Sequence, residues 1–233
     1  MSPASRGCFV TGTDTGAGKT VVAAAITAGL RGAGTRVRAL KPVLTGLDQP
    51  PEAGWPHDHE LLAAASGAEP GEVALRTFGP PVSPHLAAQL AGVTIDVERV
   101  IEEIGAAASD GELLVIEGVG GLLVPLAPGW DVRRLAAAVG LPVVIAARPG
   151  LGTINHTLLT LEAARAAGLR ILGVVLTPWP DEPGTIERSN AETIAGLGSV
   201  EVERLPFVPR ADPGSLALAA ARLPLRRWLG PGV

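Results

Sequence analysis

A glycine-rich segment near the N-terminus constrains the fold more than any other feature of the chain. Residues 8–12, CFVTG, form a short apolar run, and Gly16, Gly18, Lys19 and Thr20 follow it before an alanine-rich segment with helical character. In such a turn, glycines let backbone N–H groups face phosphate oxygens, the lysine reaches the β- and γ-phosphates, and the hydroxyl binds Mg²⁺. The positive end of the following helix also attracts anions. The segment therefore predicts a phosphate-binding loop between a strand and a helix.

The spacing of this segment departs by one residue from the usual P-loop pattern, G-x-x-x-x-G-K-[ST]. That pattern would place its first glycine at position 13, where this chain has Thr13, and Gly12 comes one residue earlier. Because the Gly18-Lys19-Thr20 end of the motif is intact and opens a helix, we interpret the segment as a variant P-loop rather than a chance glycine-rich turn.

Short apolar runs alternate with helical segments along the chain. Five runs have the length of buried parallel strands: CFVTG, RVRALKPV, LLVIEGVGG, LPVVIAARPG and LRILGVVLTPW. Helical segments cover residues 19–34, 58–67, 96–109, 131–140 and 153–168, and several of them begin with Asp or Thr and end at Gly. This alternation predicts a single α/β domain over residues 1–233, a P-loop NTPase-type parallel sheet with helices on both faces. Ligands bind such sheets at the carboxyl ends of the strands.

Composition and charge exclude several classes of protein. The formal net charge is −4 and no basic stripe is present, so we expect no nucleic-acid partner. The single cysteine, Cys8, rules out an internal disulfide framework, and its apolar surroundings predict a buried packing residue. No signal-peptide pattern and no long uncharged apolar stretch occurs, so we expect a cytoplasmic protein without a membrane partner.

Polar residues end two of the apolar runs. Lys41 and Thr45 come at the end of the second run, where a lysine can stabilise negative charge that develops on a transferred group. Glu117 ends the third run, and a carboxylate in that place can bind Mg²⁺ together with phosphate oxygens. Gly118 and Gly120 follow directly and permit close approach of the backbone to a ligand.

Two helical segments begin with residues that suit a ligand. Asp58 is typical of a helix N-cap, and its neighbours His57 and His59 do not favour zinc because i, i+2 spacing does not place both on one helix face. Gly152 precedes another helix, whose N-terminus suits an anion. His156 in the first turn of that helix is either a general base or, more commonly, a structural histidine.

These segments together resemble the dethiobiotin synthetase family. The resemblance rests on GTDTGAGKT, KPVLTG, SPH at Ser83 to His85, EGVGGLLVP and LGTINHTLLT, which occur in this order between Val10 and about Asn190. Five motifs in order are far more specific than the P-loop alone, which would suit a partition-type ATPase equally well.

The resemblance implies an ATP-dependent ligase of biotin biosynthesis. Members of this family convert ATP, CO₂ and 7,8-diaminopelargonate into the cyclic urea dethiobiotin, through a carbamate and a carbamic–phosphoric mixed anhydride. The residue types fit this chemistry because Lys19, Lys41 and Mg²⁺ screen charge between ATP and the carbamate, and no side-chain nucleophile is needed. The resemblance also implies small-molecule partners and a homodimer.

The resemblance further assigns roles to single residues. Lys19 and Lys41 are the implied catalytic cations, and Mg²⁺ is surrounded by Thr20, Asp58 and Glu117. The implied nucleotide-binding set consists of Thr15, Gly16, Ala17, Gly18, Lys19, Thr20, Val21, Asp58, Glu117, Gly118, Val119, Gly120, Thr177, Pro178, Pro206, Phe207 and Val208. The implied substrate-binding set consists of Thr45, at the nitrogen-bearing end, and of Gly152, Thr153, Ile154 and Asn155, whose backbone groups receive the carboxylate, a site completed across the dimer.

One departure from the family concerns the nucleotide base. After the fifth apolar run the family often has an Asn-Asp pair, whose asparagine reads the adenine edge, whereas this chain has Thr177-Pro178. Proline has no N–H to donate, and threonine lacks the paired donor and acceptor of an amide. We therefore predict relaxed base selectivity, with Trp179 packing near the base.

Two alternatives are weaker. An amidating ligase of the cobyrinate-synthase kind needs a glutaminase domain with a nucleophilic cysteine, and Cys8 alone does not supply one. A partition or switch ATPase usually carries an additional lysine early in the P-loop, and none lies between Gly12 and Gly18.

Overall fold

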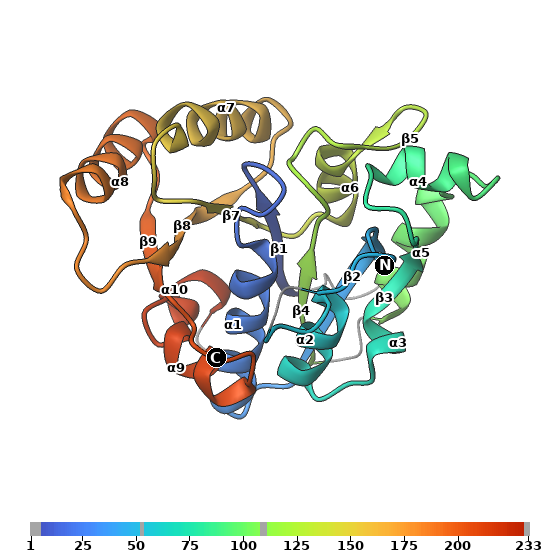
Figure 1. Cartoon of the computed structure of the whole chain (residues 1–233), viewed down its shortest axis with the longest axis horizontal. Helices are drawn as coiled ribbons and strands as arrows, with labels where there is room; N and C mark the ends of the chain where they lie inside the picture. The colour runs from blue at the N-terminus through green and yellow to red at the C-terminus, as the bar shows by residue number, and fades with distance from the viewer. Residues whose placement is uncertain (1–5, 52–53, 108–110, 231–233) are drawn as a thin grey trace.

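A parallel seven-stranded sheet forms the centre of the molecule (Figure 1). The computed structural model describes residues 6–51, 54–107 and 111–230. The strand order is β3-β2-β4-β1-β7-β8-β9. The strands are β1 (Arg6–Gly12), β2 (Val37–Leu44), β3 (Ala74–Thr77), β4 (Leu113–Glu117), β7 (Val143–Ala147), β8 (Ile171–Trp179) and β9 (Val202–Pro206). A separate antiparallel hairpin pairs β5 (Pro125–Ala127) with β6 (Trp130–Asp131).

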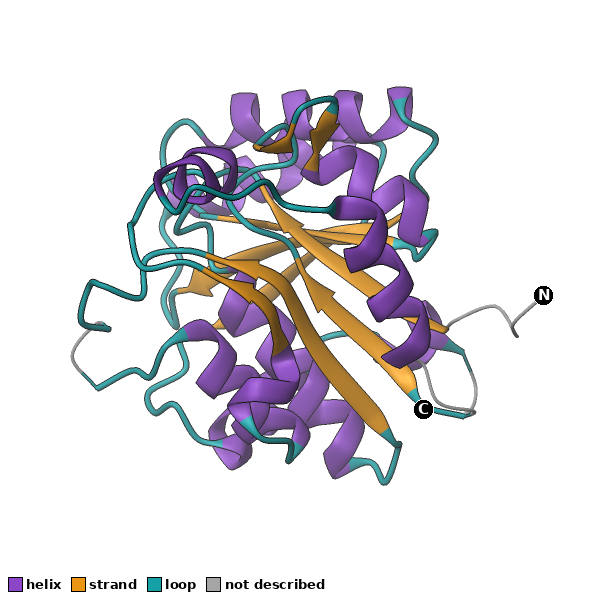
Figure 2. Ribbon diagram, turned by 90° about the vertical axis from the view of Figure 1, so that its right-hand side faces the viewer, coloured by secondary structure: helices purple, strands orange, loops and turns teal. Residues whose placement is uncertain are grey.

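Helices cover both faces of this sheet (Figure 2). Hydrophobic cores on the two faces draw on different helices. The first core involves α1 (Lys19–Gly32), α2 (Asp58–Ser66), α3 (Pro70–Val73), α9 (Pro213–Ala220) and α10 (Leu225–Leu229). The second involves α4 (Pro84–Leu90), α5 (Val97–Ala107), α6 (Val132–Val139), α7 (Thr153–Ala166) and α8 (Thr185–Gly198). The predicted fold class is therefore confirmed.

The alternation of side chains along β1 explains why its sequence is apolar throughout. Cys8 and Val10 point into the first core, and Phe9 between them points into the second. Strands that are covered on both faces read as continuous apolar runs. Cys8 is fully buried, as predicted, and burial raises the pKa of its thiol to about 12.

The five predicted helical segments correspond to α1, α2, α5, α6 and α7, although residues 108–109 of the third lie outside the described residues. Sequence patterns missed the two edge strands of the sheet. β3 has four residues and none of them is buried, and β9 carries Glu203 and Arg204 in a strand of five. Edge strands are exposed along one side and so lack the continuous apolar run that marks a central strand.

None of the helices in the described part of the chain has the length and apolar character of a membrane span. That residues 1–233 form one domain stays a prediction.

Candidate functional site

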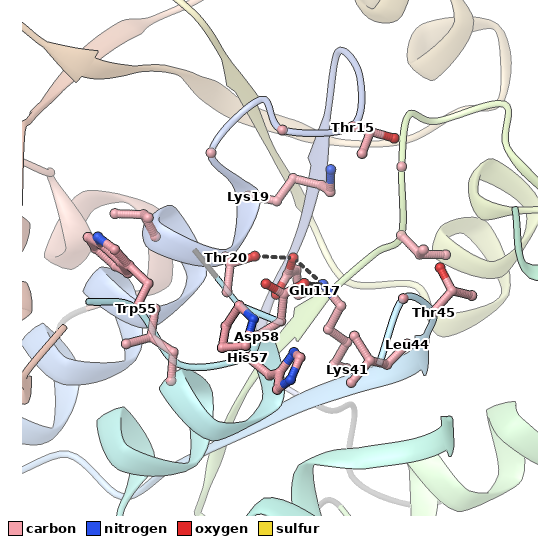
Figure 3. Close-up of a pocket in the computed structure, with 18 of the residues that line it drawn as sticks. Thr15, Lys19, Thr20, Lys41, Leu44, Thr45, Trp55, His57, Asp58 and Glu117 are labelled. Carbon is pink, nitrogen blue, oxygen red and sulfur yellow. Dashed lines mark hydrogen bonds and ion pairs between the residues drawn. The ribbon is translucent and has the colours of Figure 1, made fainter. Parts of the chain in front are cut away.

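One cavity of about 830 Å³ lies at the carboxyl ends of the central strands (Figure 3). This volume is in the range of small-molecule sites. Many of the predicted site residues line it: Thr15, Gly16, Gly18, Lys19, Thr20, Val21, Lys41, Thr45, Asp58, Glu117, Val119, Gly120, Thr177, Pro178, Phe207 and Val208. The structure thus brings together residues that come from distant parts of the sequence.

The glycine-rich loop connects β1 to α1 on one side of the cavity. Gly16 and Gly18 have φ angles of +68° and +87°, a region that glycine adopts without strain. A Cβ atom at Gly18 would lie 2.4 Å from Cγ2 of Thr177, so the close approach of β8 also requires glycine. Gly18 caps α1 without a side-chain hydrogen bond, which leaves the first backbone N–H groups of the helix available to a ligand.

Lys19 is the first residue of α1, and its side chain folds back over the loop. Its Nζ atom donates a hydrogen bond to the backbone oxygen of Asp14 at 2.9 Å. Burial lowers the pKa of Lys19, although the negative charge of Glu117 opposes this effect. A buried ammonium held at a helix N-terminus in this way is a cation that lacks full compensation, which suits an anionic ligand.

A second lysine joins two carboxylates beside the loop (Figure 3). Nζ of Lys41 lies 2.5 Å from Oδ2 of Asp58 and 2.6 Å from Oε1 of Glu117. The hydroxyl of Thr20 donates to the same Oε1 atom of Glu117 at 2.9 Å. Lys41 is 3% exposed and Glu117 is fully buried, whereas the Asp58 side chain is 41% exposed. Strand ends and the start of α2 therefore converge on one charged cluster.

Burial and neighbouring charges have opposite effects on the pKa values of this cluster. Burial alone would lower the pKa of Lys41, but Glu117 and Asp58 outweigh it, so the pKa is raised and the ammonium stays charged. Burial acts to raise the pKa of Asp58, but Lys41 outweighs it and the pKa falls. Burial raises the pKa of Glu117 against the opposing charge of Lys41. Glu117 is therefore the carboxylate whose charge is least compensated.

The donor atoms of the cluster fit a hard divalent cation. Oε2 of Glu117 is buried and has no hydrogen-bond partner within the described residues. Asp58 contributes a second carboxylate and Thr20 a hydroxyl, and Mg²⁺ prefers such oxygen ligands together with phosphate oxygens. An unpartnered carboxylate oxygen in this position can bind a cation from solution.

Two details of this cluster differ from the sequence prediction. Lys41 lies inside β2 rather than after it, because β2 leaves β4 after Leu40 and continues alongside β3 to Leu44. Asp58 is the first residue of α2 rather than its N-cap. The N-cap is His57, whose backbone N–H donates to the Glu60 side chain at 2.9 Å. The Asp58 carboxylate is thus free to bind Lys41.

Some predicted residues do not line the cavity. They are Ala17, Gly118, Pro206, Gly152, Thr153, Ile154 and Asn155. The last four begin α7, and the loop before them is fixed by Asn190, whose side chain donates to backbone oxygens of Pro149 and Gly150. Leu151 in this loop is 98% exposed. The predicted carboxylate site is therefore separate from the cavity within one chain.

Trp179 also lies away from the cavity, contrary to the prediction that it packs near the base. It packs against the second core, and the guanidinium of Arg204 lies 5.1 Å from its ring centre. β8 continues to Trp179 and pairs with Pro206 of β9, which directs this residue along the sheet rather than toward the loop.

Two residues next to the predicted site, Trp55 and Arg148, were not predicted from the sequence. Trp55 lines the cavity from the loop before α2. Arg148 directly follows β7, and its Nε atom donates to the backbone oxygen of Gly16 at 2.9 Å. The expectation that functional residues follow strands was sufficient to find Arg148, whereas Trp55 lies in a proline-rich loop without any pattern.

Known proteins resemble this chain in sequence over most of its length. A family model described as an AAA domain matches residues 6–213. The ATP-dependent dethiobiotin synthetase BioD of Anaeromyxobacter dehalogenans is 45% identical over 207 residues, which cover 88% of this chain and 91% of that protein. The same enzyme of Mycobacterium avium is 42% identical over 215 residues, which cover 91% and 89%.

Solved structures share the fold at lower sequence identity. Cobyrinic acid a,c-diamide synthase from Mycobacterium smegmatis, with bound ADP and magnesium, has a TM-score of 0.56 at 19% identity and covers 96% of this chain and 95% of that chain. A ParA family ATPase from Chlorobium tepidum has a TM-score of 0.53 at 13% identity, with 97% of each chain covered. At these identities the likeness shows the fold alone.

Proposed function

The chain belongs to the family of ATP-dependent dethiobiotin synthetases, and from that premise we propose how its cavity forms dethiobiotin from ATP, CO₂ and 7,8-diaminopelargonate. The enzyme is a ligase of biotin biosynthesis. The observation that supports the proposal most strongly is the meeting of Lys19 and Lys41 with Asp58 and Glu117 at the phosphate loop.

The phosphates of the nucleotide bind along the loop and the start of α1. Backbone N–H groups from Thr15 to Val21 face them, and the ammonium of Lys19 contacts the transferred group. Support comes from the left-handed glycines and from the open N-terminus of α1. Val119 and Gly120 line the facing wall, and Gly120 itself has a φ angle of +61°.

Thr20, Asp58 and Glu117 would hold Mg²⁺. When bound, this ion supplies positive charge to the phosphate oxygens and reduces their repulsion toward an anionic nucleophile. Without it, the ammonium of Lys41 pairs with both carboxylates. When those oxygens bind a cation instead, Lys41 is available to pair with the carbamate.

The reaction requires positive charge and correct positioning of the substrates, and no covalent bond to the protein. One amine of the substrate attacks CO₂ and loses a proton, which gives a carbamate. A carbamate oxygen then attacks the γ-phosphorus of ATP and releases ADP. The second amine attacks the carbonyl carbon, the C–O bond to phosphate breaks, and a further proton leaves. Lys19 and Lys41 stabilise the negative charge in the phosphoryl-transfer step, where their contribution is largest.

The substrate's nitrogen-bearing end binds near Thr45, and its carboxylate binds the backbone N–H groups at the start of α7. Gly152, Thr153, Ile154 and Asn155 lie outside the cavity of one chain, and the adjoining Leu151 is almost fully exposed. Both observations support a homodimer in which a second copy completes this site. The cytoplasmic location stays a prediction.

The experiment that tests the proposal measures phosphate release from MgATP and bicarbonate, with and without 7,8-diaminopelargonate. We expect release only with the diamine, and a product with the mass of dethiobiotin. Release that does not require the diamine would instead favour a partition or switch-type ATPase, the alternative that shares this fold.

A further inference from the structure

The cavity has two chemically different regions. One, which we call the charged end, carries Lys19, Lys41, Asp58 and Glu117. In the other, which we call the apolar end, the lining side chains belong to the first hydrophobic core: Val21, Trp55, Leu61 and Val208. Because Val21 directly follows Thr20 on α1, the apolar end begins within one turn of the phosphate loop.

Trp55 is the large aromatic side chain of the apolar end (Figure 3). All four tryptophans of the chain lie in the described residues, and Trp55 is the one that lines the cavity. The others have structural contacts. Trp228 is 6% exposed and bonded to Glu201, Trp179 packs under Arg204, and Trp130 packs against the second core. Trp55 is half-buried and keeps part of its indole toward the cavity.

The backbone around Trp55 is restricted before any ligand binds. Pro56 follows it directly, and a residue before proline is confined to extended conformations. Trp55 is followed two residues later by the N-cap of α2, where His57 and Glu60 form a capping box. An aromatic side chain on such a support loses little conformational freedom when a flat ligand stacks on it.

We propose that the indole of Trp55 is the surface on which the nucleobase of the triphosphate stacks. The inference rests on the proposed function, in which the phosphates occupy the charged end beside Lys19. A nucleoside triphosphate is a chain of anionic groups joined to a planar ring system, and the cavity offers cations at one end and an aromatic wall at the other. Stacking accepts any base, because each base has a π-face.

Gln49 and His57 bring polar atoms to the cavity, but the first-core side chains that line it together with Trp55 favour stacking over recognition of the base edge. Val21, Leu61 and Val208 have no polar atoms in their side chains. Thr177 is 2% exposed, and its methyl group faces Gly18 in the phosphate loop. Phe207, which also lines the cavity, is 64% exposed and adds a second aromatic wall. The base is therefore held mainly through its faces. The relaxed base selectivity expected from Thr177-Pro178 thus has a structural basis in Trp55.

The test separates the contribution of the base to binding from that of the phosphates. The dissociation constants of MgATP, MgCTP and magnesium tripolyphosphate are measured by calorimetry for the wild type, Trp55→Ala and Trp55→Phe. We expect Trp55→Ala to weaken ATP and CTP binding by about tenfold or more, and Trp55→Phe to retain most of the affinity. Tripolyphosphate has no base, so its affinity should be the same in all three proteins.

Intrinsic fluorescence gives a second readout. MgATP should quench the wild-type emission and the emission of the control variant Trp130→Phe, whereas the quenching should disappear in Trp55→Phe. Unchanged ATP affinity in Trp55→Ala would overturn the proposal, and so would an equal loss for tripolyphosphate, which would indicate a structural role. If the wild type binds neither nucleotide nor tripolyphosphate, the proposed phosphate site itself is wrong and the stacking proposal falls with it.

Discussion

Replacement of Lys41 by methionine gives a quantitative test of the charged cluster. Lys41 is 3% exposed, and its ammonium contacts a fully buried carboxylate, that of Glu117, at 2.6 Å. Removal of one partner of a buried ion pair leaves the other charge uncompensated, which typically costs about 3–5 kcal/mol. Because Lys19 remains near Glu117, we expect the lower end, about 3 kcal/mol, in the absence of nucleotide and Mg²⁺. For a chain of this size, that loss lowers Tm by roughly 6–12 °C.

The direction in which the stability loss of Lys41→Met changes with pH follows from the carboxyl group of Glu117. In Lys41→Met, burial raises the folded-state pKa of Glu117 without opposition from Lys41, so the folded protein retains the proton while the unfolded chain releases it above about pH 4.3. A group with a raised pKa contributes stability below the unfolded pKa and loses it as pH rises toward the folded pKa. The stability deficit of the variant should therefore grow as pH rises above about 4.3, the usual pKa of an exposed glutamate.

Urea unfolding of wild type and Lys41→Met at pH 5 and pH 8 measures this difference. The stability deficit should be clearly larger at pH 8, and the double variant Lys41→Met/Glu117→Gln should recover part of it because the buried charge is gone. A deficit below about 1 kcal/mol at pH 8, or one that is equal at both pH values, would refute the description of Lys41 and Glu117 as a buried ion pair.

Three further predictions concern the loop and the core. Gly18→Ala should destabilise the protein by about 2–5 kcal/mol and abolish nucleotide binding, because alanine meets both a φ of +87° and the methyl group of Thr177; wild-type unfolding and binding would contradict this. Cys8 should resist a thiol reagent at pH 8 in the native state and react at once in denaturant, since its thiol pKa is about 12; rapid native labelling would show otherwise. Arg148→Gln should raise KM for MgATP by about two- to tenfold with little change in kcat, because its bond to Gly16 orients the loop; an unchanged KM would remove that role.

The sequence predicts much of the fold because the central strands are buried on both faces. Residues 113–117 read as an unbroken apolar run that ends in Glu117, and the structure has β4 at the same residues. The edge strands β3 and β9 cannot be recognised in this way because one side of each is exposed. Their amino-acid composition therefore resembles that of a loop.

Site residues can be predicted from the sequence where they directly follow a strand. The prediction fails where tertiary contacts determine the position of a residue. Glu117 and the phosphate loop illustrate the first case. The place of Lys41 inside β2 depends on a change of partner strand, and that of Trp55 depends on how a proline-rich loop packs against the first core. Neither leaves a periodic pattern in the sequence. Gly152 lies outside the cavity of one chain, and its role in a substrate site completed by a second copy stays a prediction.

In the proposed reaction, this cavity activates a carbamate by phosphorylation. Single-turnover reaction with ¹⁸O-labelled bicarbonate, MgATP and 7,8-diaminopelargonate tests it directly, because the carbamate oxygen that attacks the γ-phosphorus leaves with the phosphate when the ring closes. We expect one ¹⁸O atom in the released phosphate, seen by mass spectrometry, in proportion to the dethiobiotin formed. Phosphate without the label would contradict it, because the oxygen would then have come from water and ATP hydrolysis would not pass through a mixed anhydride.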